Sequence, residues 1–367
     1  MLASGNSREA IGQAALAKGA PVRSLISGWW NAVVLAAALT GLGAVSPAQA
    51  GPTLDKIKQA GQFNCGVQTG LAGFAQPDNA GVYSGFNVDI CKALSAAIFG
   101  DPGKVKYVPL TAQQRFTALQ SGEVDVLVNN TTWTLTRDTD LGFNFAPVVF
   151  FDGQGFMVAK KLGVKSAKEL NGATVCVQPG TTTELNLADY FRANKMEYKP
   201  VVIEKIDEVT SAFFNGRCDV YTTDSSGLAA TRIGRASNPD DYVILPERIS
   251  KEPLAPVVRH GDDQWHDIVD WVIYALMQAE ESGITKANVD DMLKSDDPGI
   301  KRMLGVTPGM GKALGLDEKW AYNEIKLVGN YGEIFERNLG AGSPMKLERG
   351  LNALWTKGGL IYPIPIR

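Results

Sequence analysis

Three loops that follow expected strands carry polar groups suited to holding a charged small molecule. The first, Asn129 to Asp138, is dense in hydroxyl and amide groups and contains Arg137. A guanidinium offers a planar pair of donors that matches a carboxylate in bidentate fashion. The loop therefore indicates a carboxylate site. A solvated loop in which Arg137 pairs with Asp138 or Asp140 fits the composition equally well.

The second loop, Pro179 to Glu184, opens an expected helix and contains Thr181 and Thr182. Free backbone N–H groups and the positive end of the helix dipole attract anions at such a position. The alternative is plain capping, with Thr181 as the N-cap and Glu184 in a capping box, and both can hold at once. The single glycine, with no lysine after it, does not match a nucleotide-binding phosphate loop.

The third loop begins with an acid, Asp224, and runs to Gly227. An acid at a strand end that faces a cleft suits an ammonium group, whereas the alternative is a helix cap. Combined with the two anion-binding loops, the acid describes a site for a zwitterion. Arg137 and the helix terminus would hold a carboxylate, and Asp224 would hold an ammonium. A free α-amino acid fits that arrangement.

The elements that must position these loops alternate along the chain. We expect strands at 63–67, 105–110, 124–128, 174–178, 201–203 and 220–223. Helices are expected between them at 87–99, 112–121 (capped by Thr111), 183–195 and 207–215. Because the alternation repeats on either side of about residue 155, it predicts two α/β lobes, each a mainly parallel sheet flanked by helices. Ligands bind beyond the carboxyl ends of such strands, which predicts a cleft between the lobes.

The chain becomes helical after His260, with helices expected at 262–282, 286–293 and 318–338. We interpret 305–367 as extra helices packed on the first lobe. Two chain crossings between the lobes are expected, near 152–155 and 253–259. The expected division is therefore 51–153 with 257–367 for the first lobe, and 154–256 for the second.

Composition excludes several classes of protein. The 367 residues include 36 Lys and Arg against 39 Asp and Glu, so the basic footprint of a nucleic-acid-binding protein is missing. Two histidines, His260 and His266, leave little material for a histidine metal site or a Ser-His-Asp triad. We expect no metal, no cofactor and no nucleic-acid partner.

The first fifty residues have the order of a secretory signal. Basic residues come first, an Ala-rich apolar stretch runs from Trp29 to Val45, and small residues follow up to Ala50. This order predicts export to the periplasm with cleavage after Ala50. The alternative, a transmembrane anchor, needs about 20 predominantly apolar residues, and this stretch is shorter.

Export changes the interpretation of the four cysteines, Cys65, Cys91, Cys176 and Cys218. An even count in an oxidising compartment indicates disulfides. We favour Cys65–Cys91 and Cys176–Cys218, because each pair then falls inside one expected lobe. Four buried free thiols are the alternative.

Several motifs occur in order at spacings that resemble a known family. They are GFNVDI at 85–90, RFTALQSGEVD at 115–125, NTTWTLTR at 130–137, GTT at 180–182 and CDVYTTD at 218–224. Together they resemble the polar amino-acid-binding proteins of ABC transporters, the family 3 extracellular solute-binding proteins. TAQQRF at 111–116 and FDGQGFMV at 151–158, with the four cysteines, resemble its general L-amino-acid-binding subgroup.

The resemblance implies a two-lobed periplasmic-binding-protein fold of type II and a set of ligand-binding positions. Arg137 would hold the α-carboxylate and Asp224 the ammonium. Asn130 and Thr132 would contact the ligand through backbone and hydroxyl groups. Thr182, beside Thr181, would donate to the carboxylate at the helix terminus. An inner-membrane ABC permease is the implied partner, and a monomer is expected.

Departures from the family pattern bear on specificity. Where relatives often place a Tyr and a Phe over the ligand, this chain has Leu71 and Ala112. A less aromatic wall suits several side chains rather than one. Gln68, Gln113 and Trp133 could supply polar and stacking contacts, and core packing is the alternative for Trp133.

Three classes of function fit these observations to different degrees. We favour a carrier that hands amino acids to a permease. An enzyme on the same scaffold, such as a periplasmic prephenate or arogenate dehydratase, would need an acid–base group, and none is evident. A sensing module would need a second membrane segment or a signalling domain.

Overall fold

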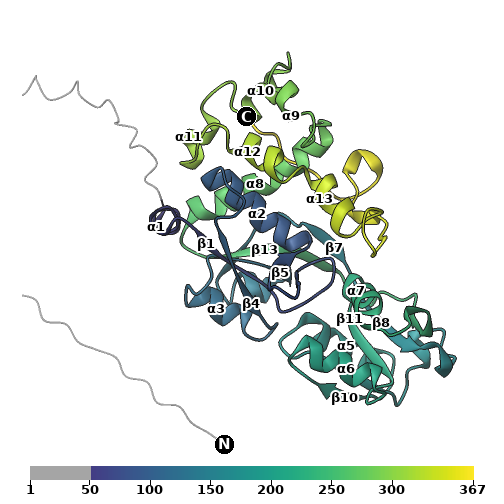
Figure 1. The fold of residues 1–367 in the computed structure, drawn as a ribbon. Coiled ribbons are helices and arrows are strands. Elements are labelled where there is room, and N and C mark those ends of the chain that lie inside the picture. The colour runs from purple at the N-terminus through teal and green to yellow at the C-terminus, as the bar shows by residue number, and fades with distance from the viewer. Residues whose placement is uncertain (1–50) are drawn as a thin grey trace, which may run out of the picture. The chain divides into compact units, whose positions relative to one another are not determined.

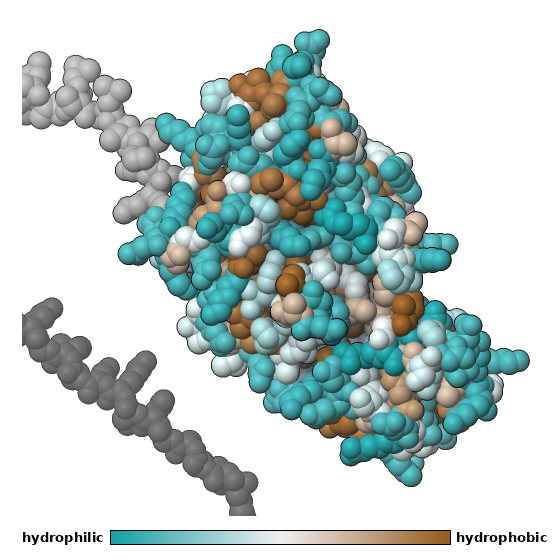
Figure 2. Space-filling model, in the orientation of Figure 1, coloured by the Kyte–Doolittle hydropathy of each residue, from teal (hydrophilic) through white to brown (hydrophobic). Residues whose placement is uncertain are grey.

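The computed structural model describes residues 51–367, so the expected signal segment and its cleavage site lie outside the described residues. Of the helices within 51–367, none combines the length and the apolar character needed to cross a membrane. The face drawn in Figure 2 is mostly hydrophilic, with apolar side chains in small separate groups. Isolated apolar residues are normal on a protein surface and indicate no particular partner.

The first sheet has the strand order β4–β1–β5–β13–β6, and β7 also pairs with β13 (Figure 1). Its strands are β1 (Phe63–Gln68), β4 (Val105–Leu110), β5 (Val126–Thr132), β6 (Phe143–Phe145), β7 (Phe150–Asp152) and β13 (Glu252–Arg259). β4, β1 and β5 run parallel, whereas β13 is antiparallel to β5, β6 and β7.

The second sheet has the order β10–β9–β11–β8–β12. Its strands are β8 (Gln154–Ala159), β9 (Thr174–Val177), β10 (Lys199–Val202), β11 (Val220–Asp224) and β12 (Tyr242–Ile244). Here β10, β9 and β11 are parallel and β8 is the reversed strand. Each sheet thus has a parallel half, as expected, and one reversed strand. The reversed strands, β8 and β13, follow the two places where the chain passes from one sheet to the other.

Helices follow most of the parallel strands and cover the sheets. In the first half of the chain they are α1 (Pro52–Ala60), α2 (Phe86–Phe99), α3 (Arg115–Gln120) and α4 (Leu135–Asp138), with a small hairpin of β2 (Gln76–Pro77) and β3 (Tyr83–Ser84). Around the second sheet they are α5 (Thr182–Ala193), α6 (Ile206–Phe214) and α7 (Ser225–Arg235). The chain then continues through α8 (Asp263–Glu281), α9 (Val289–Met292), α10 (Pro298–Met303), α11 (Met310–Leu314), α12 (Trp320–Leu327) and α13 (Tyr331–Asn338).

The C-terminal helices pack on the helices of the first sheet. α12 contacts both α2 and α8 (Figure 1). α13 brings Phe335 into a stack with Phe150 of β7, with ring centroids 6.2 Å apart. The helix expected at 318–338 is wrong as a single element. It breaks because Gly329 adopts a left-handed φ of 105° and Asn330 starts α13 with a capping box to Glu333.

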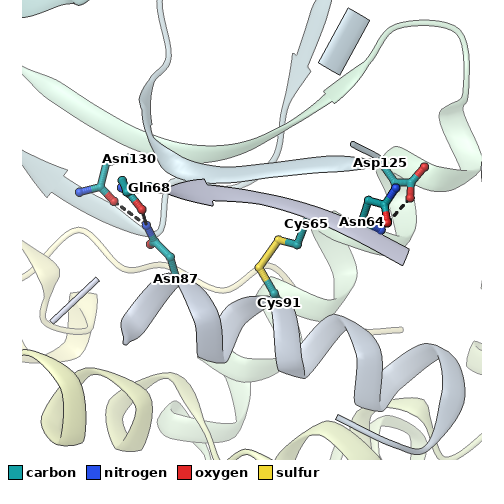
Figure 3. Close-up of a disulfide and its surroundings, with 7 residues drawn as sticks. All are labelled: Asn64, Cys65, Gln68, Asn87, Cys91, Asp125 and Asn130. Atoms are coloured by element: carbon teal, nitrogen blue, oxygen red, sulfur yellow. Dashed lines mark hydrogen bonds between the residues drawn. A yellow bond between two sulfur atoms is a disulfide. The ribbon is translucent and has the colours of Figure 1, made fainter. Parts of the chain in front are cut away.

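The cysteines form the expected pairs, and the free-thiol alternative is wrong. Cys65 of β1 bonds to Cys91 of α2 (Figure 3). Cys176 of β9 bonds to Cys218, two residues before β11. Each bond ties elements around one sheet. The loops that they close span 26 and 42 residues, so the chain-entropy model gives about 3–4 kcal/mol for each.

Helix α12 contains a buried carboxyl group without a partner. Glu324 is fully buried, and neither of its carboxyl oxygens has a hydrogen-bond partner within residues 51–367. Burial raises the pKa of this carboxyl well above its usual range. Folding therefore favours the neutral, protonated form of Glu324.

This burial predicts a pH-dependent loss of stability. Below about pH 4 the carboxyl is protonated in both the folded and the unfolded chain, so ionisation costs nothing. As the pH rises, the unfolded chain ionises first, and the free energy of unfolding falls. Glu324→Gln should therefore be nearly neutral at pH 4 and stabilising at pH 7 by about 1 kcal/mol or more, measured by urea unfolding. The exposed Glu123→Gln is the matched control, and an equal pH profile for both variants would contradict the assignment.

Candidate functional site

A cavity lies at the carboxyl ends of the parallel strands of both sheets. Its wall includes Gln68 at the end of β1, Thr132 at the end of β5 and Asp224 at the end of β11. Thr182, the first residue of α5, adds the helix terminus that follows β9. The cavity volume is about 90 Å³, which suits a small molecule rather than a drug-sized one. Residues far apart in sequence meet here because parallel strands end at the same edge.

Most of the expected ligand residues line this cavity. They are Gln68, Leu71, Asn130, Thr132, Thr181, Thr182 and Asp224. Arg137 and Trp133 do not line it.

Arg137 lies just behind the wall. Its side chain is buried, and its Nη1 donates to the carbonyl oxygen of Thr132 at 2.8 Å. Burial lowers the pKa of this guanidinium, and the charges of Glu252 and Asp224 oppose that effect. The alternative, a solvated loop in which Arg137 pairs with Asp138 or Asp140, does not fit, since Arg137 is buried and Asp138 accepts a hydrogen bond from the indole of Trp133 at 2.6 Å.

Trp133 faces away from the cavity. It is 41% exposed, and its ring stacks on Phe145 with a centroid distance of 5.5 Å. Its indole N–H is already used by Asp138. This placement supports neither a ligand contact nor full burial in the core.

Arg115 takes a place in the cavity wall that the sequence analysis did not assign. It is 4% exposed, donates from Nη1 to the carbonyl oxygen of Asn129 at 3.0 Å, and leaves its Nε without a partner within residues 51–367. Burial and then the charge of Arg137 lower the pKa of Arg115 to about 9, so the group stays charged at neutral pH. One feature of the sequence could have identified Arg115 as a site residue. It is the first residue of the helix that follows β4, and the three loops analysed above likewise follow the ends of strands.

A bulge at the end of β5 produces these contacts. Leu127 pairs with Val257 and Thr131 with Ala255, so β5 has extra residues opposite β13. Within the bulge Asn130 adopts a left-handed φ of 42°, which Asn tolerates better than most residues. The irregular backbone turns carbonyl groups away from the sheet, and the arginines satisfy them.

Asn87 of α2 ties two expected ligand residues together. Its side-chain amide donates to Gln68 at 2.9 Å and to Asn130 at 2.8 Å, as Figure 3 shows. Asn87 is buried and was quoted above only as part of a motif. The contact fixes both side chains at the edge of the cavity from the helix behind them.

Asp224 supplies the acidic side of the cavity. Although it occupies the N-cap position of α7, its side chain makes no capping hydrogen bond, so the capping alternative is wrong. Burial raises the pKa of Asp224 well above its usual range, and the neighbouring charges of Asp152 and Glu252 raise it further. Arg115 and Arg137 act in the opposite direction. A cation beside Asp224 would favour its ionised form.

Thr181 does cap α5, as expected, because its hydroxyl accepts a hydrogen bond from the N–H of Glu184 at 3.0 Å. The reciprocal half of the box differs, since the Glu184 carboxylate accepts from the N–H of Gly180. Gly180 has a left-handed φ of 71°, and a Cβ there would lie 3.3 Å from the backbone of Gln113. Only glycine allows this loop of the second sheet to approach the first so closely.

Thr111 makes a second contact between the two sheets' loops. Its hydroxyl donates to Glu204 at 2.7 Å. The same hydroxyl accepts from the N–H of Gln114 at 3.2 Å, so Thr111 caps the turn that leads into α3, as expected, although α3 itself starts later, at Arg115. Within 51–367, no three His, Cys, Asp or Glu side chains form a group that could hold a metal ion. The chemistry at hand is hydrogen bonding and charge pairing with a small polar ligand.

Comparisons with known proteins agree with this geometry. Residues 63–286 match the model of the bacterial extracellular solute-binding proteins, family 3. The chain is 61% identical over 335 residues to the general L-amino acid-binding periplasmic protein AapJ of Rhizobium johnstonii, covering 91% of this chain and 97% of that protein. It is 57% identical to the glutamate/glutamine/aspartate/asparagine-binding protein BztA of Rhodobacter capsulatus, covering 93% and 99%.

A solved structure extends the likeness to three dimensions. The periplasmic binding protein of an ABC transporter from Brucella ovis, determined with glutathione bound, is 60% identical. It superposes with a TM-score of 0.84 over 86% of this chain and 99% of that one. The two-lobed type II fold expected from the motifs is thereby confirmed. The chain belongs to the family 3 bacterial extracellular solute-binding proteins.

Proposed function

We propose that this protein binds free L-amino acids in the cavity between two lobes and delivers them to the inner-membrane permease of an ABC transporter. The observation that carries the proposal is the separation of charge around the cavity. Arg115 and Arg137 lie at the first sheet, and Asp224 lies at the second. A zwitterionic α-amino acid complements both signs, as neither a simple anion nor a cation would.

Each end of the ligand has a proposed place. The α-carboxylate meets the N–H groups at the start of α5 and the charge of Arg137, and the ammonium meets Asp224. The lobes comprise residues 51–153 with 257–367, and residues 154–256. The ligand contacts both lobes, since Arg115 of the cavity wall comes from one and Asp224 from the other. Residues 1–50 act as the export signal, and the mature protein is a periplasmic monomer.

The side chain of the ligand is proposed to meet Arg115 and Gln68. A buried guanidinium with an unused N–H favours a carboxylate or carboxamide oxygen, because leaving that donor unpaired is costly. The preferred class is therefore acidic and amide amino acids. The γ-glutamyl end of glutathione carries the same α-amino and α-carboxylate groups, but a tripeptide exceeds a cavity of about 90 Å³ unless the lobes separate further.

The enzyme alternative, a prephenate or arogenate dehydratase, has less support. The two relatives described above, at 61% and 57% identity, carry binding-protein names, and their lengths are covered almost completely. The cavity's polar groups also hold one another in fixed hydrogen bonds. We assign no catalytic residue.

A thermal-shift panel of the twenty L-amino acids, with glutathione added, tests the proposal. Ligand at 100 times its Kd adds about 2.7 kcal/mol of stability, so binding raises the melting temperature. We expect the largest shifts for L-glutamate, L-glutamine, L-aspartate and L-asparagine. D-Enantiomers serve as the control for nonspecific stabilisation. A panel with no response to any L-amino acid would rule out the proposed function.

Replacement of Arg115 tests the side-chain assignment. Arg115→Lys keeps the charge but loses the planar fork, so it should weaken L-glutamate binding by at least about tenfold. Binding of L-leucine, measured by calorimetry, should change by less than about threefold. Trp133→Ala is the matched control, because this side chain lies outside the cavity, and it should leave both affinities unchanged. Equal losses for the two ligands in Arg115→Lys would show that Arg115 serves the fold only.

A further inference from the structure

Glu252, the first residue of β13, is a buried carboxylate that the proposed site has not used. It is 1% exposed and has four hydrogen-bond donors around it. Its Oε2 accepts from the hydroxyls of Thr132 at 2.6 Å and Thr182 at 2.8 Å. Its Oε1 accepts from Ser250 at 2.6 Å and from the amide of Asn186 at 2.8 Å. Thr132 belongs to the first sheet and Thr182 to the helix α5 of the second, so one carboxylate joins both.

These contacts fix the direction of two hydrogen bonds at the cavity wall. An ionised carboxylate can only accept, so a threonine hydroxyl that bonds to Glu252 donates its single proton. The two hydroxyl oxygens also lie 3.3 Å apart, but the Glu252 oxygen is the nearer acceptor for each, at 2.6 Å and 2.8 Å. Thr132 and Thr182 also line the cavity. Each hydroxyl can then offer a ligand only an oxygen lone pair, as a hydrogen-bond acceptor. While both hydroxyls donate hydrogen bonds to Glu252, neither can donate to a ligand carboxylate, although both can accept from a ligand cation.

The carbonyl oxygen of Thr132 is committed as well, because Arg137 donates to it at 2.8 Å. The hydroxyl is thus the remaining acceptor of Thr132 in the cavity that Asp224, the other group suited to an ammonium, also lines. The carboxylate of the ligand is left to the backbone N–H groups of the α5 terminus and to the guanidiniums. Both ends of a zwitterion are then satisfied without competition for the same hydroxyl proton.

We propose that Glu252 is a positioning residue that turns the Thr132 and Thr182 hydroxyls into acceptors for the ligand's ammonium group. The inference rests on the proposed function and deepens it. Glu252 does not touch the ligand. It acts by fixing the direction in which the two hydroxyl protons point. One of these hydroxyls comes from the first sheet and the other from the helix that follows β9 of the second. Selectivity for an α-ammonium over an uncharged α-substituent follows from this arrangement.

The test compares L-glutamate with L-2-hydroxyglutarate, whose α-hydroxyl replaces the ammonium. Glu252→Met removes the acceptor at similar length and frees the threonine protons. It should weaken L-glutamate by about tenfold or more, the scale for a hydrogen bond to a charged group, and leave L-2-hydroxyglutarate within about threefold. Glu252→Gln keeps a carbonyl oxygen that can accept from both hydroxyls, so L-glutamate should stay within about threefold of wild type. Calorimetry measures the affinities, and circular dichroism checks the fold.

A double-mutant cycle asks whether Glu252 acts through Thr132. Thr132→Val removes the hydroxyl and should weaken L-glutamate binding. Adding Glu252→Met should then cause a smaller loss than it does in the wild-type chain, because only the Thr182 hydroxyl is left for Glu252 to position. Glu324→Met, a buried glutamate away from the cavity, is the matched control and should leave the ratio of the two affinities unchanged.

Several outcomes would overturn the inference. The first is an equal loss of affinity for both ligands in Glu252→Met. The second is additive losses of affinity in the double-mutant cycle. The third is a tenfold loss of L-glutamate affinity in Glu252→Gln, which would show that Glu252 acts through its charge or the fold. If Glu252→Met does not fold, the Glu252→Gln and Thr132→Val measurements still decide. Failure of wild-type protein to bind any L-amino acid would instead remove the proposed function. The two failures are therefore distinguishable.

Discussion

The burial of charge where the two sheets face each other constrains the rest of the structure. Arg115, Arg137, Asp152, Asp224 and Glu252 all lie largely out of solvent at this place. Moving an ion out of water costs several kcal/mol unless charges and hydrogen bonds compensate. The strand ends, the bulge in β5 and the start of α5 supply that compensation. The elements around the cavity are therefore positioned by an electrostatic requirement as much as by their apolar cores.

The arginines illustrate how structure and binding share one group. Each uses part of its guanidinium on a backbone carbonyl near the end of β5, Arg115 on that of Asn129 and Arg137 on that of Thr132. An arginine has five N–H donors, so anchoring the strand end does not exhaust it. Its position is fixed before a ligand arrives, which lowers the entropy lost on binding. The hydrogen bonds to backbone carbonyl oxygens also stabilise the positive charge of each buried guanidinium.

The sequence predicted the parts of the fold that depend on local pattern. Alternating apolar segments gave the parallel halves of both sheets, and pairing within each expected lobe gave the disulfides. Thr181 was recognised as a cap because its spacing to Glu184 is a local signal. Patterns did not predict the reversed strands, since pairing direction depends on where the chain crosses between sheets. Nor did they predict the break at Gly329, where an apolar period continues through a left-handed residue.

The same distinction applies to the candidate site. Loops at strand ends identified Thr132, Thr182 and Asp224 as cavity residues, because topology brings strand ends together. Arg115 and Glu252 were missed for opposite reasons. Arg115 lies within a motif whose pattern predicts an ordinary amphipathic helix. Glu252 begins a strand, in a segment where nothing local indicates that its carboxylate will meet threonines about 70 and 120 residues away.

The two disulfides connect cysteines that are consecutive along the chain, Cys65 with Cys91 and Cys176 with Cys218. No loop that one bond closes is threaded or overlapped by the other. A chain that crosses a membrane from its N-terminus, as we propose here, therefore presents each correct partner next in line. An oxidant that joins cysteines in their order of arrival makes the native set directly, without later exchange between wrong pairs. Each lobe can thus complete its covalent cross-link before the whole chain has been exported.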